Sequence, residues 1–262
     1  MQGTIATPVA LPFNASPPLR MRIKDCNWSM VERYLRQGDR AVLPLGSVEQ
    51  HAFLSLAVDA ILAEEVAAAA AEPLGVPVFP AQAYGVTPTY MAYPGTMSLR
   101  LETLLQVLRD LIGSLHQHGF RRIVLVNGHG GNNGAASLLQ ALGAELPGIQ
   151  LKWHNWWAAP RTMAFVRAQD PQASHASWME NFEGLTRLPG VALPDAPKPL
   201  VDYARMALMD PVAKRAYLGD GCYGGHYQQP PAVMDQLWAI AVQETRDILD
   251  GPWLNSPSAS QG

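Results

Sequence analysis

The chain has 262 residues, of which 48% are hydrophobic and 16% are charged. It is long enough to bury a sizeable core, and the low fraction of charged residues suggests much buried surface, as in an oligomer. Its formal net charge of -3 excludes the basic surface of a nucleic-acid-binding protein or a polybasic membrane anchor. No run of about 18 apolar residues predicts a membrane span, and the first residues lack a secretory signal pattern. Two cysteines cannot form a disulfide framework, which favours a reducing cytoplasm.

Residues 1–20 contain four prolines and little periodicity, and we interpret them as an extended arm. We expect one α/β domain over residues 21–254 and a disordered tail over residues 255–262. Within the domain, short apolar runs predict four strands, at residues 40–46, 76–80, 121–127 and 150–156.

Helical periodicity alternates with these strands. It predicts helices at residues 59–72, 101–118, 133–146 and 231–249. Strands that alternate with helices of this length favour parallel pairing, and thus a three-layer, mostly parallel β-sheet flanked by helices. Residues 189–230 are rich in Pro and Gly, and we interpret them as a lid or a subunit contact.

Chemistry-bearing residues follow the predicted strands. Glu49 and His51 come after the first strand, two positions apart, so in an extended segment their side chains point the same way, and Asp59 follows eight residues later. His129 follows the third strand, and the fourth leads to the stretch from His175 to Glu180. Ligands bind at the carboxyl ends of parallel strands, so we expect these side chains to meet at one edge.

Carboxylates and neutral imidazoles are the ligands of Zn²⁺ or Mn²⁺, and a shared carboxylate can bridge two ions.

Other interpretations stay open. The glycine-rich loop at residues 128–131 could bind a phosphate, although it lacks the G-x-G-x-x-G spacing and a P-loop lysine. His175 could be a helix-start residue without a role, and His154 a core or pocket residue. His226 could contact a subunit or substrate. We interpret His116 and His118 as structural.

Several motifs together resemble the creatininase family of metal-dependent amidohydrolases. They are L-P-L-G-S-V-E-Q-H at 43–51, Asp59, Y-G-V at 84–86, Y-P-G-T-M-S-L at 93–99, V-N-G-H-G-G-N at 126–132, and H-A at 175–176 followed by Glu180. They span residues 40 to 185 in the family's order. The resemblance implies parallel strands flanked by helices, a dinuclear site for Zn or Mn, with Fe also acceptable, and a homo-oligomer, commonly a hexamer.

The resemblance also implies roles for single residues. Glu49 and His129 match ligands of one metal, His51 matches a ligand of the other, and Asp59 matches the bridging carboxylate. His175 matches a catalytic histidine placed for proton transfer to the substrate. Creatininase itself carries a glutamate where this chain has Gly131, and we therefore assign the second metal, and part of the catalytic centre, to Glu180.

The chain departs from the family in its pocket. The loop at residues 51–59 is shorter than usual, and Trp178 replaces an acidic residue. These departures weaken the case for creatinine as the substrate. Tryptophans near the motifs could cover a substrate or belong to the core: Trp153, Trp156 and Trp178. Possible partners for an anionic substrate are Arg100, Lys152 and Arg161.

The expected function is hydrolysis of a small cyclic amide by metal-activated water. The same centre would serve a lactone in a catabolic route, because both reactions pass through a tetrahedral oxyanion. A binding protein that has lost the chemistry is a further alternative, but all five expected ligands are present. Peptide trimming ranks lower, because nothing in the sequence marks a peptide groove.

Overall fold

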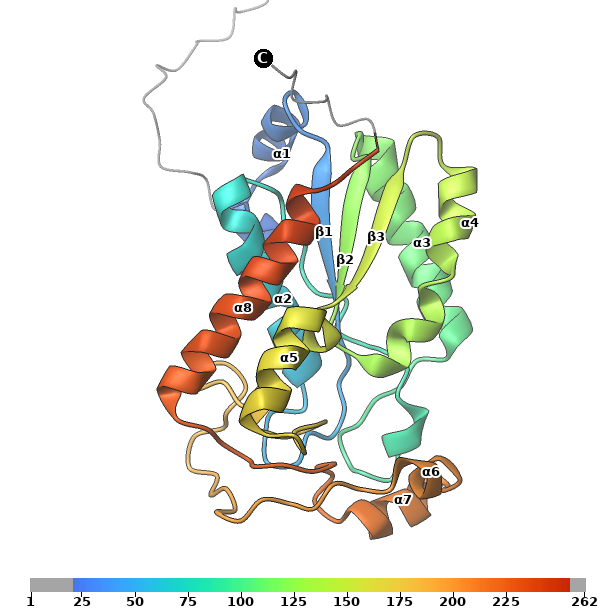
Figure 1. Cartoon of the computed structure of the whole chain (residues 1–262). Coiled ribbons are helices and arrows are strands. Elements are labelled where there is room, and N and C mark those ends of the chain that lie inside the picture. The colour runs from blue at the N-terminus through green and yellow to red at the C-terminus, as the bar shows by residue number, and fades with distance from the viewer. Residues whose placement is uncertain (1–20, 255–262) are drawn as a thin grey trace, which may run out of the picture.

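A computed structural model describes residues 21–254 of the chain (Figure 1). Its centre is a parallel sheet in which β2 (Arg122–Asn127) lies between β1 (Arg40–Leu45) and β3 (Gln150–Asn155). These strands confirm three of the four predicted ones. The predicted arm (1–20) and tail (255–262) lie outside the described residues.

The fourth prediction, a strand over residues 76–80, is wrong as a regular strand. The segment runs parallel to β1 but forms only isolated bridges, including one between Val78 and Val42. Val42 still donates its N–H to the Pro77 carbonyl and accepts a hydrogen bond from the Phe79 N–H, both at 2.9 Å. Pro44 in β1 has no N–H to continue this ladder, and proline interrupts sheet pairing for that reason.

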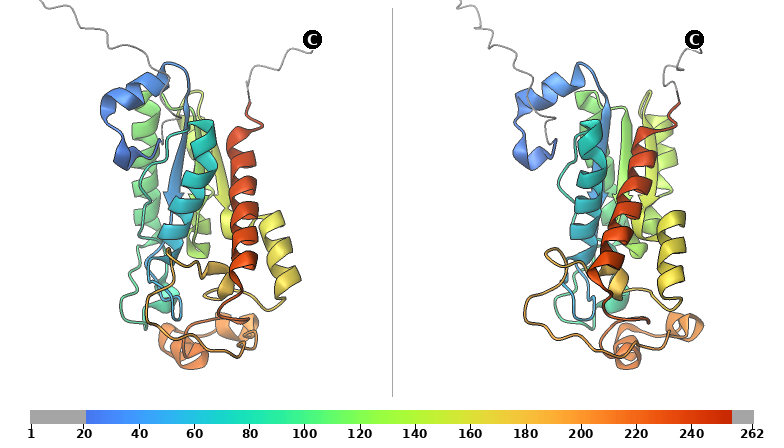
Figure 2. Two further views of the ribbon diagram at one scale, coloured as in Figure 1. Left: turned by 90° about the vertical axis from the view of Figure 1, so that its left-hand side faces the viewer. Right: turned by 60° about the vertical axis from the view of Figure 1, so that its left-hand side comes forward.

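One face of the sheet packs against α2 (Val58–Ala71) and α8 (Pro231–Asp250), as Figures 1 and 2 show. α5 (Pro160–Gln169), which the sequence analysis did not predict, packs on α8. Successive strand side chains point to opposite faces, so alternate residues such as Val42 and Val124 enter this core.

The opposite face packs against α3 (Leu101–His118) and α4 (Leu138–Glu145), and Leu43 and Ile123 enter this second core. The three-layer prediction is therefore confirmed. Helix α3 has its predicted bounds, and Gly119 ends it in the left-handed conformation with φ +106°. Helix α4 is shorter than predicted, because a 3₁₀ segment takes up its first part.

That 3₁₀ segment covers Gly130–Ala135 and contains three glycines, which disfavour a regular α-helix. A short α1 (Trp28–Leu35), also not predicted, precedes β1 and is capped by the Asn27 side chain. No helix within residues 21–254 is both long and apolar enough to cross a membrane.

Residues 189–230, here called the lobe, lie beyond the carboxyl ends of the strands (Figure 1). The lobe is mostly irregular, as its Pro and Gly content suggests, but it contains α6 (Tyr203–Ala207) and α7 (Pro211–Leu218). Its two halves are tied together by backbone hydrogen bonds, including one from Val201 N–H to the Tyr223 carbonyl at 2.8 Å. The lobe therefore covers the sheet edge where ligands are expected.

Candidate metal centre

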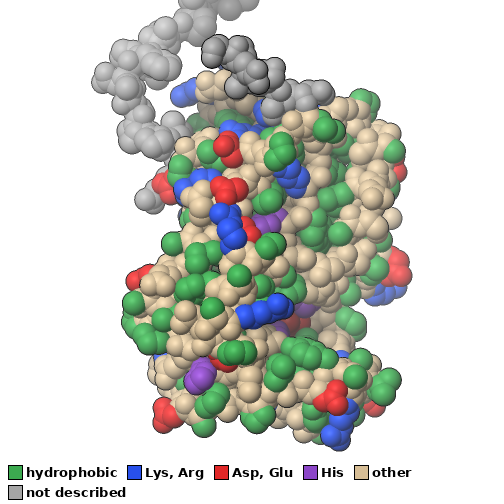
Figure 3. Space-filling model, in the orientation of Figure 1, with side chains coloured by type: hydrophobic (Ala, Val, Ile, Leu, Met, Phe, Trp, Pro, Cys, Tyr) green, Lys and Arg blue, Asp and Glu red, His purple; other side chains and the backbone are tan. Residues whose placement is uncertain are grey.

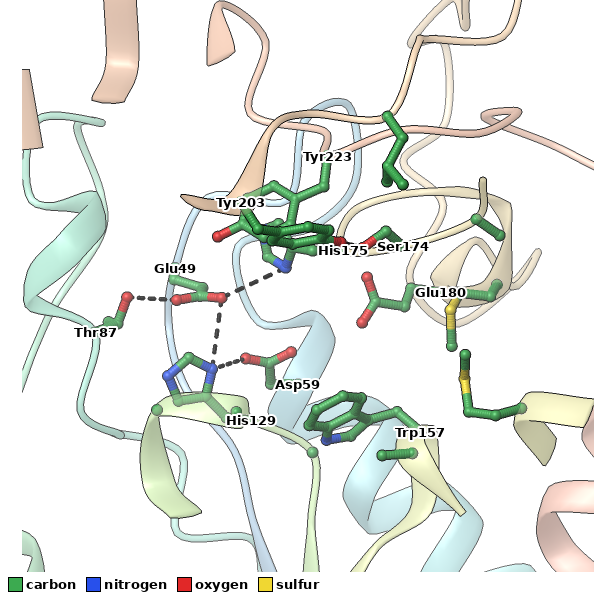
Figure 4. A pocket seen from close by; sticks show the side chains of 18 of the residues that line it. Glu49, Asp59, Thr87, His129, Trp157, Ser174, His175, Glu180, Tyr203 and Tyr223 are labelled. Carbon is green, nitrogen blue, oxygen red and sulfur yellow. Dashed lines mark hydrogen bonds and ion pairs between the residues drawn. The ribbon is translucent and has the colours of Figure 1, made fainter. Parts of the chain in front are cut away.

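The five predicted ligands come together in one buried cluster at the carboxyl ends of the strands. Figure 4 shows Glu49, Asp59, His129 and Glu180 of this cluster. Three groups have ligand atoms within 4.8 Å of one another and could each hold a metal ion. One is Glu49 with His51 and His175, and the other two overlap: Glu49 with Asp59 and His129, and His51 with Asp59 and Glu180. Asp59 belongs to both groups. This arrangement has the form of two ion sites that share one carboxylate.

Glycines allow the strand ends to approach the helix that carries Asp59. A Cβ at Gly46, just after β1, would lie 2.3 Å from the Ala60 Cα. A Cβ at Gly128, just after β2, would lie 2.3 Å from the Asp59 carbonyl oxygen. Any side chain at either position would therefore push the first turn of α2 away from the sheet edge.

Asp59 is the centre of the cluster, and its two oxygens face different histidines. Oδ1 lies 3.0 Å from His51 Nε2, and Oδ2 lies 2.9 Å from His129 Nδ1. The Ser47 hydroxyl donates a hydrogen bond to Oδ2 at 2.7 Å. The carboxylate is thus fixed with one oxygen toward each half of the cluster.

Each of the two histidines uses its other ring nitrogen to bind a backbone carbonyl. His51 Nδ1 lies 3.2 Å from the Glu49 carbonyl oxygen, and His129 Nε2 lies 3.0 Å from that of Val86. A carbonyl can only accept, so these nitrogens carry the protons of the neutral rings. When the rings are neutral, as metal binding requires, the opposite nitrogens direct lone pairs at carboxylates, and His51 Nε2 is buried 3.0 Å from Asp59 Oδ1. A divalent cation between the lone pairs and the carboxylates fits this donor set.

The same geometry shifts the pKa values of the histidines. Burial disfavours the charged ring of His51, but the Asp59 carboxylate outweighs burial and raises the pKa to about 10. Burial also opposes the charging of His129, yet Glu49 and Asp59 raise its pKa to about 9. Burial raises the pKa of Glu180 to about 7, although His51 acts in the opposite direction. In the metal-free cluster, protons therefore occupy positions that cations can take.

The loop that carries His129 is held by the side chains of two asparagines, Asn127 and Asn132. Asn127 accepts a hydrogen bond from the His129 N–H at 3.2 Å and donates to its carbonyl at 2.6 Å. Asn132 donates to the Gly46 carbonyl at 3.0 Å. A Cβ at Gly131 would lie 2.0 Å from the Val86 carbonyl oxygen, so no glutamate fits there without moving the loop.

Glu180 reaches the cluster from the loop that also carries His175. The Ala176 N–H donates to Glu180 Oε2 at 2.7 Å, and that oxygen lies 3.9 Å from His51 Nε2. Ala176 has φ +60°, a left-handed conformation that is uncommon for alanine. The turn therefore bends back so that both side chains face the cluster (Figure 4).

His175 lies above the cluster and is held on several sides. Its ring stacks on Tyr90, with centroids 5.4 Å apart, and Nδ1 lies 3.8 Å from Glu49 Oε1. The amide of Gln50 donates to His175 Nε2 at 2.9 Å. Burial and the nearby His51 hold the pKa of His175 well below its ordinary value. The ring is therefore neutral at neutral pH.

The orientation of the Gln50 amide fixes the tautomer of that ring. Gln50 Oε1 accepts from the Ala52 N–H, and Nε2 donates to the Gly221 carbonyl, both at 3.1 Å. Because the backbone partners allow only this assignment, the second N–H of Nε2 points at His175 Nε2. Neutral His175 consequently carries its proton on Nδ1, the nitrogen nearer the cluster.

A cavity of about 910 Å³ opens above the cluster. Figure 3 shows a hollow on this face of the molecule with acidic and histidine side chains at its base. Its walls come from α5, from the lobe residues Leu200, Tyr203 and Tyr223, and from Trp157. Thr87, which donates a short hydrogen bond to Glu49, also lines it.

The tryptophans considered for substrate contact do not line this cavity. Trp156 and Trp178 are core residues, 1% and 0% exposed, and Trp153 donates to the Asn155 side chain. Trp157 lines the cavity instead. Strand and turn spacing could have suggested this residue, because it stands just beyond the end of β3.

The basic residues considered as anion partners also lie elsewhere. Lys152 donates to the Ile248 carbonyl at 2.7 Å, Arg161 pairs with Asp247, and Arg100 does not line the cavity. Arg167, which the sequence analysis missed, is a cavity residue. The signal for it is the helical spacing of residues 160, 163, 164 and 167, which places them on one face of α5.

Three of the remaining histidines, His154, His226 and His116, have contacts outside the metal cluster. His154 is buried and bonded to the Thr245 hydroxyl at 3.0 Å, which decides between the core and pocket interpretations in favour of the core. His226 pairs with Asp170 at 3.1 Å. His116 contacts the Pro147 carbonyl at 2.9 Å near the end of α3.

Comparison with known proteins shows relatives with different substrates. A creatinine amidohydrolase of Pseudomonas putida is 35% identical over 114 residues, which are 41% of this chain and 44% of the relative. A mycofactocin precursor peptide peptidase of Mycolicibacterium smegmatis is 37% identical over 108 residues, which are 38% of this chain and 43% of the relative. The alignments thus cover less than half the length of these relatives.

The fold matches over a longer span. A solved structure titled "Creatininase Mn" aligns with a TM-score of 0.68 over 87% of this chain and 96% of that chain, at 22% identity. The sequence profile of the creatininase family, described as creatinine amidohydrolase, matches residues 24–249, which is most of the chain. The chain therefore belongs to the creatininase family.

Proposed function

We propose that this protein is a metal-dependent hydrolase that cleaves the amide bond of a small, cyclic substrate. The observation that carries the proposal is the pair of histidine lone pairs that face Asp59 from opposite sides in a buried cluster. A binding protein without chemistry has no need for two buried histidine nitrogens around a shared carboxylate, at 3.0 and 2.9 Å from its oxygens. Burial of this many ionisable groups is costly unless cations compensate them.

Two divalent ions, Zn or Mn with Fe as a further option, would be held by the two groups of the cluster. Glu49 and His129 would bind one ion, His51 and Glu180 the other, and Asp59 would bind both. Bound ions would supply Lewis-acid chemistry, which lowers the pKa of water and withdraws electrons from a carbonyl group. A related structure carries Mn in its title, which supports this metal among the candidates.

His175 would act on the substrate as a positioned proton carrier. Its Nδ1–H is directed toward the cluster, and Gln50 occupies its other nitrogen. In the resting state the ring can therefore donate a hydrogen bond to the oxygen or nitrogen on which negative charge develops. Tyr90 and Tyr223 pack against the ring, with centroids 5.4 and 4.9 Å away, and keep it in place.

The first experiment is metal content per chain, measured on protein purified without chelator. We expect close to two equivalents in the natural sequence and fewer than about 0.2 in Asp59→Asn, because both ions lose their shared ligand. Asp247→Asn removes a carboxylate of a surface pair with Arg161 and should retain both equivalents. No metal in the natural protein, even after addition of Zn or Mn, would reject the proposal.

Hydrolysis is then measured with matched cyclic amides and lactones of equal ring size. We expect turnover of an amide that requires the metal and is lost in Asp59→Asn. Turnover of the lactones alone would replace the amide proposal with a lactonase. Two bound metals without turnover of any probe would leave a binding protein as the better account.

A further inference from the structure

One face of α5 forms a wall of the cavity. Pro160, Met163, Ala164 and Arg167 all line it, and their spacing of three and four residues places them on the same side of the helix. The helix begins just after Trp157, which lies beside Asp59 in Figure 4. Because a helix rises about 1.5 Å per residue, Arg167 lies about 10 Å along the axis from Pro160.

Arg167 is the only lysine or arginine among the described residues that line the cavity. Arg167 is exposed, and its guanidinium forms no hydrogen bond, ion pair or ring contact with the described part of the chain. Arg161 on the same helix provides a contrast, because it faces away from the cavity and pairs with Asp247 at 2.5 Å. The cavity therefore offers an uncompensated positive charge at some distance from the metal cluster.

The surroundings of Arg167 suit an extended ligand. Apolar side chains such as Met163, Met179 and Leu200 line the cavity together with the metal cluster. A volume of about 910 Å³ is near the upper end of the range for drug-sized ligands, and far more than a single small ring fills. A ligand that spans this space would contact the cluster at one end and Arg167 at the other.

We propose that the substrate is an amide that carries a carboxylate, which binds Arg167 while the scissile bond lies at the metal cluster. This inference rests on the proposed function and names its substrate class. A guanidinium presents parallel N–H donors that match a carboxylate, and such charge-assisted bonds are stronger than neutral ones. An apolar segment between the two groups would pack against α5 and the lobe.

The test compares acids with their own amides. The probes are hydantoin-5-acetic acid, hydantoin-5-propionic acid and hydantoin-5-butanoic acid, in which the spacer between a cyclic amide and the carboxylate varies, and the primary amide of each. Their Kd, or KM for a pair that is hydrolysed, is measured on Zn-loaded protein of known metal content. We expect at least one acid to bind about tenfold more tightly than its amide.

Variants then locate the charge that is responsible. In Arg167→Gln we expect the acid-to-amide preference to fall to about one, while Arg167→Lys should recover part of it and metal content should not change. Arg161→Gln is the matched control and should keep the full preference. Equal binding of every acid and its amide, or a preference that survives in Arg167→Gln, would overturn the inference. The latter result would mean that the carboxylate binds the metals.

Failure of this inference can be distinguished from failure of the proposed function. A metal-loaded protein that hydrolyses neutral amides without any acid preference would reject only the role of Arg167. A protein that binds no metal but prefers acids through Arg167 would reject the hydrolase and retain an anion-binding cavity.

Discussion

The cavity has a floor, which is the metal cluster, and a wall, which is formed by α5 and the lobe residues Leu200, Tyr203 and Tyr223. The two parts are built differently. On the floor, each candidate ligand is held by a second contact: His51 by the Glu49 carbonyl, His129 by that of Val86, and Asp59 by Ser47. On the wall, Arg167 has no partner in the described chain, and Leu200 is 45% exposed. A preorganised floor suits one type of chemistry, whereas exposed wall side chains such as Arg167 and Leu200 can change with the substrate.

The relatives differ in the substrates that their names give. One acts on creatinine by its name and another on a precursor peptide, yet each is related to this chain over a stretch of more than 100 residues. Changes to the floor should therefore abolish the reaction, and changes to the wall should redirect it. The following predictions test this difference, beginning with the largest effect.

Replacement of one floor ligand should remove one metal. Glu180→Gln keeps the shape of the side chain but loses the charge that faces His51, so we expect about one equivalent of metal and a fall in kcat of about a thousandfold, because metal-ion stabilisation contributes several kcal/mol. Elemental analysis and initial rates measure both. Glu183→Gln, three residues later and exposed, is the control. Two equivalents with unchanged affinity in Glu180→Gln would contradict this assignment.

Loss of the His175 ring should leave the metals in place. In His175→Gln we expect two equivalents of metal and a fall in kcat of about a hundredfold or more, which is the usual contribution of a positioned proton carrier. His226→Gln removes a histidine bonded to Asp170 outside the cavity and should change kcat little. Near-full activity of His175→Gln would exclude its catalytic role.

The sequence allowed the floor to be predicted better than the wall. Glu49, His51 and Asp59 follow one strand within a short stretch, so the strand-end rule brings them together without knowledge of distant contacts. Arg167 could not be found in that way, because its helix was not recognised and its position depends on how α5 packs on α8. The lobe likewise depends on long-range contacts that join Val201 to Tyr223.

The strands and helices around the sheet also show that features set by distant contacts are hard to predict from the sequence. The apolar runs of β1 and β2 predicted strands correctly, but the run at 76–80 did not become a regular strand because the neighbouring Pro44 has no N–H to share. The helix expected at residues 133–146 begins late for a tertiary reason: the loop before it is held by Asn132 against the Gly46 carbonyl. The homo-oligomer and the cytoplasmic location remain predictions.

Gln50 tests whether the tautomer of His175 matters. Gln50→Leu removes one hydrogen bond, worth about 1 kcal/mol, so we expect kcat to fall about fivefold, with KM and metal content unchanged. Gln50→Glu places a hydrogen-bond acceptor against His175 Nε2, which favours the proton on that nitrogen. We expect this variant to lower kcat further than Gln50→Leu does. The ¹⁵N chemical shifts of the imidazole report the tautomer directly. Unchanged shifts in both variants would show that Gln50 does not set it.

The last prediction concerns how the free energy of unfolding of the metal-free protein depends on pH. Because the folded-state pKa values of His51 and His129 are raised to about 10 and 9, the metal-free folded protein holds protons that the unfolded chain releases above about 6.5. This stabilisation is complete below pH 6.5 and disappears as pH rises through 9 to 10. We expect the free energy of unfolding of the metal-free protein to fall by several kcal/mol between pH 7 and 10.

Zn-loaded protein is the matched control, because the ions replace these protons and bind more tightly as pH rises. Its free energy of unfolding should not fall over the same window. His154 provides an internal contrast, since burial lowers its pKa to about 4 and its contribution increases with pH between 4 and 6.5. Urea unfolding at several pH values, with and without Zn, measures these slopes. Parallel slopes for the metal-free and Zn-loaded forms would mean that protons and metal ions do not compete for the same side chains of the cluster.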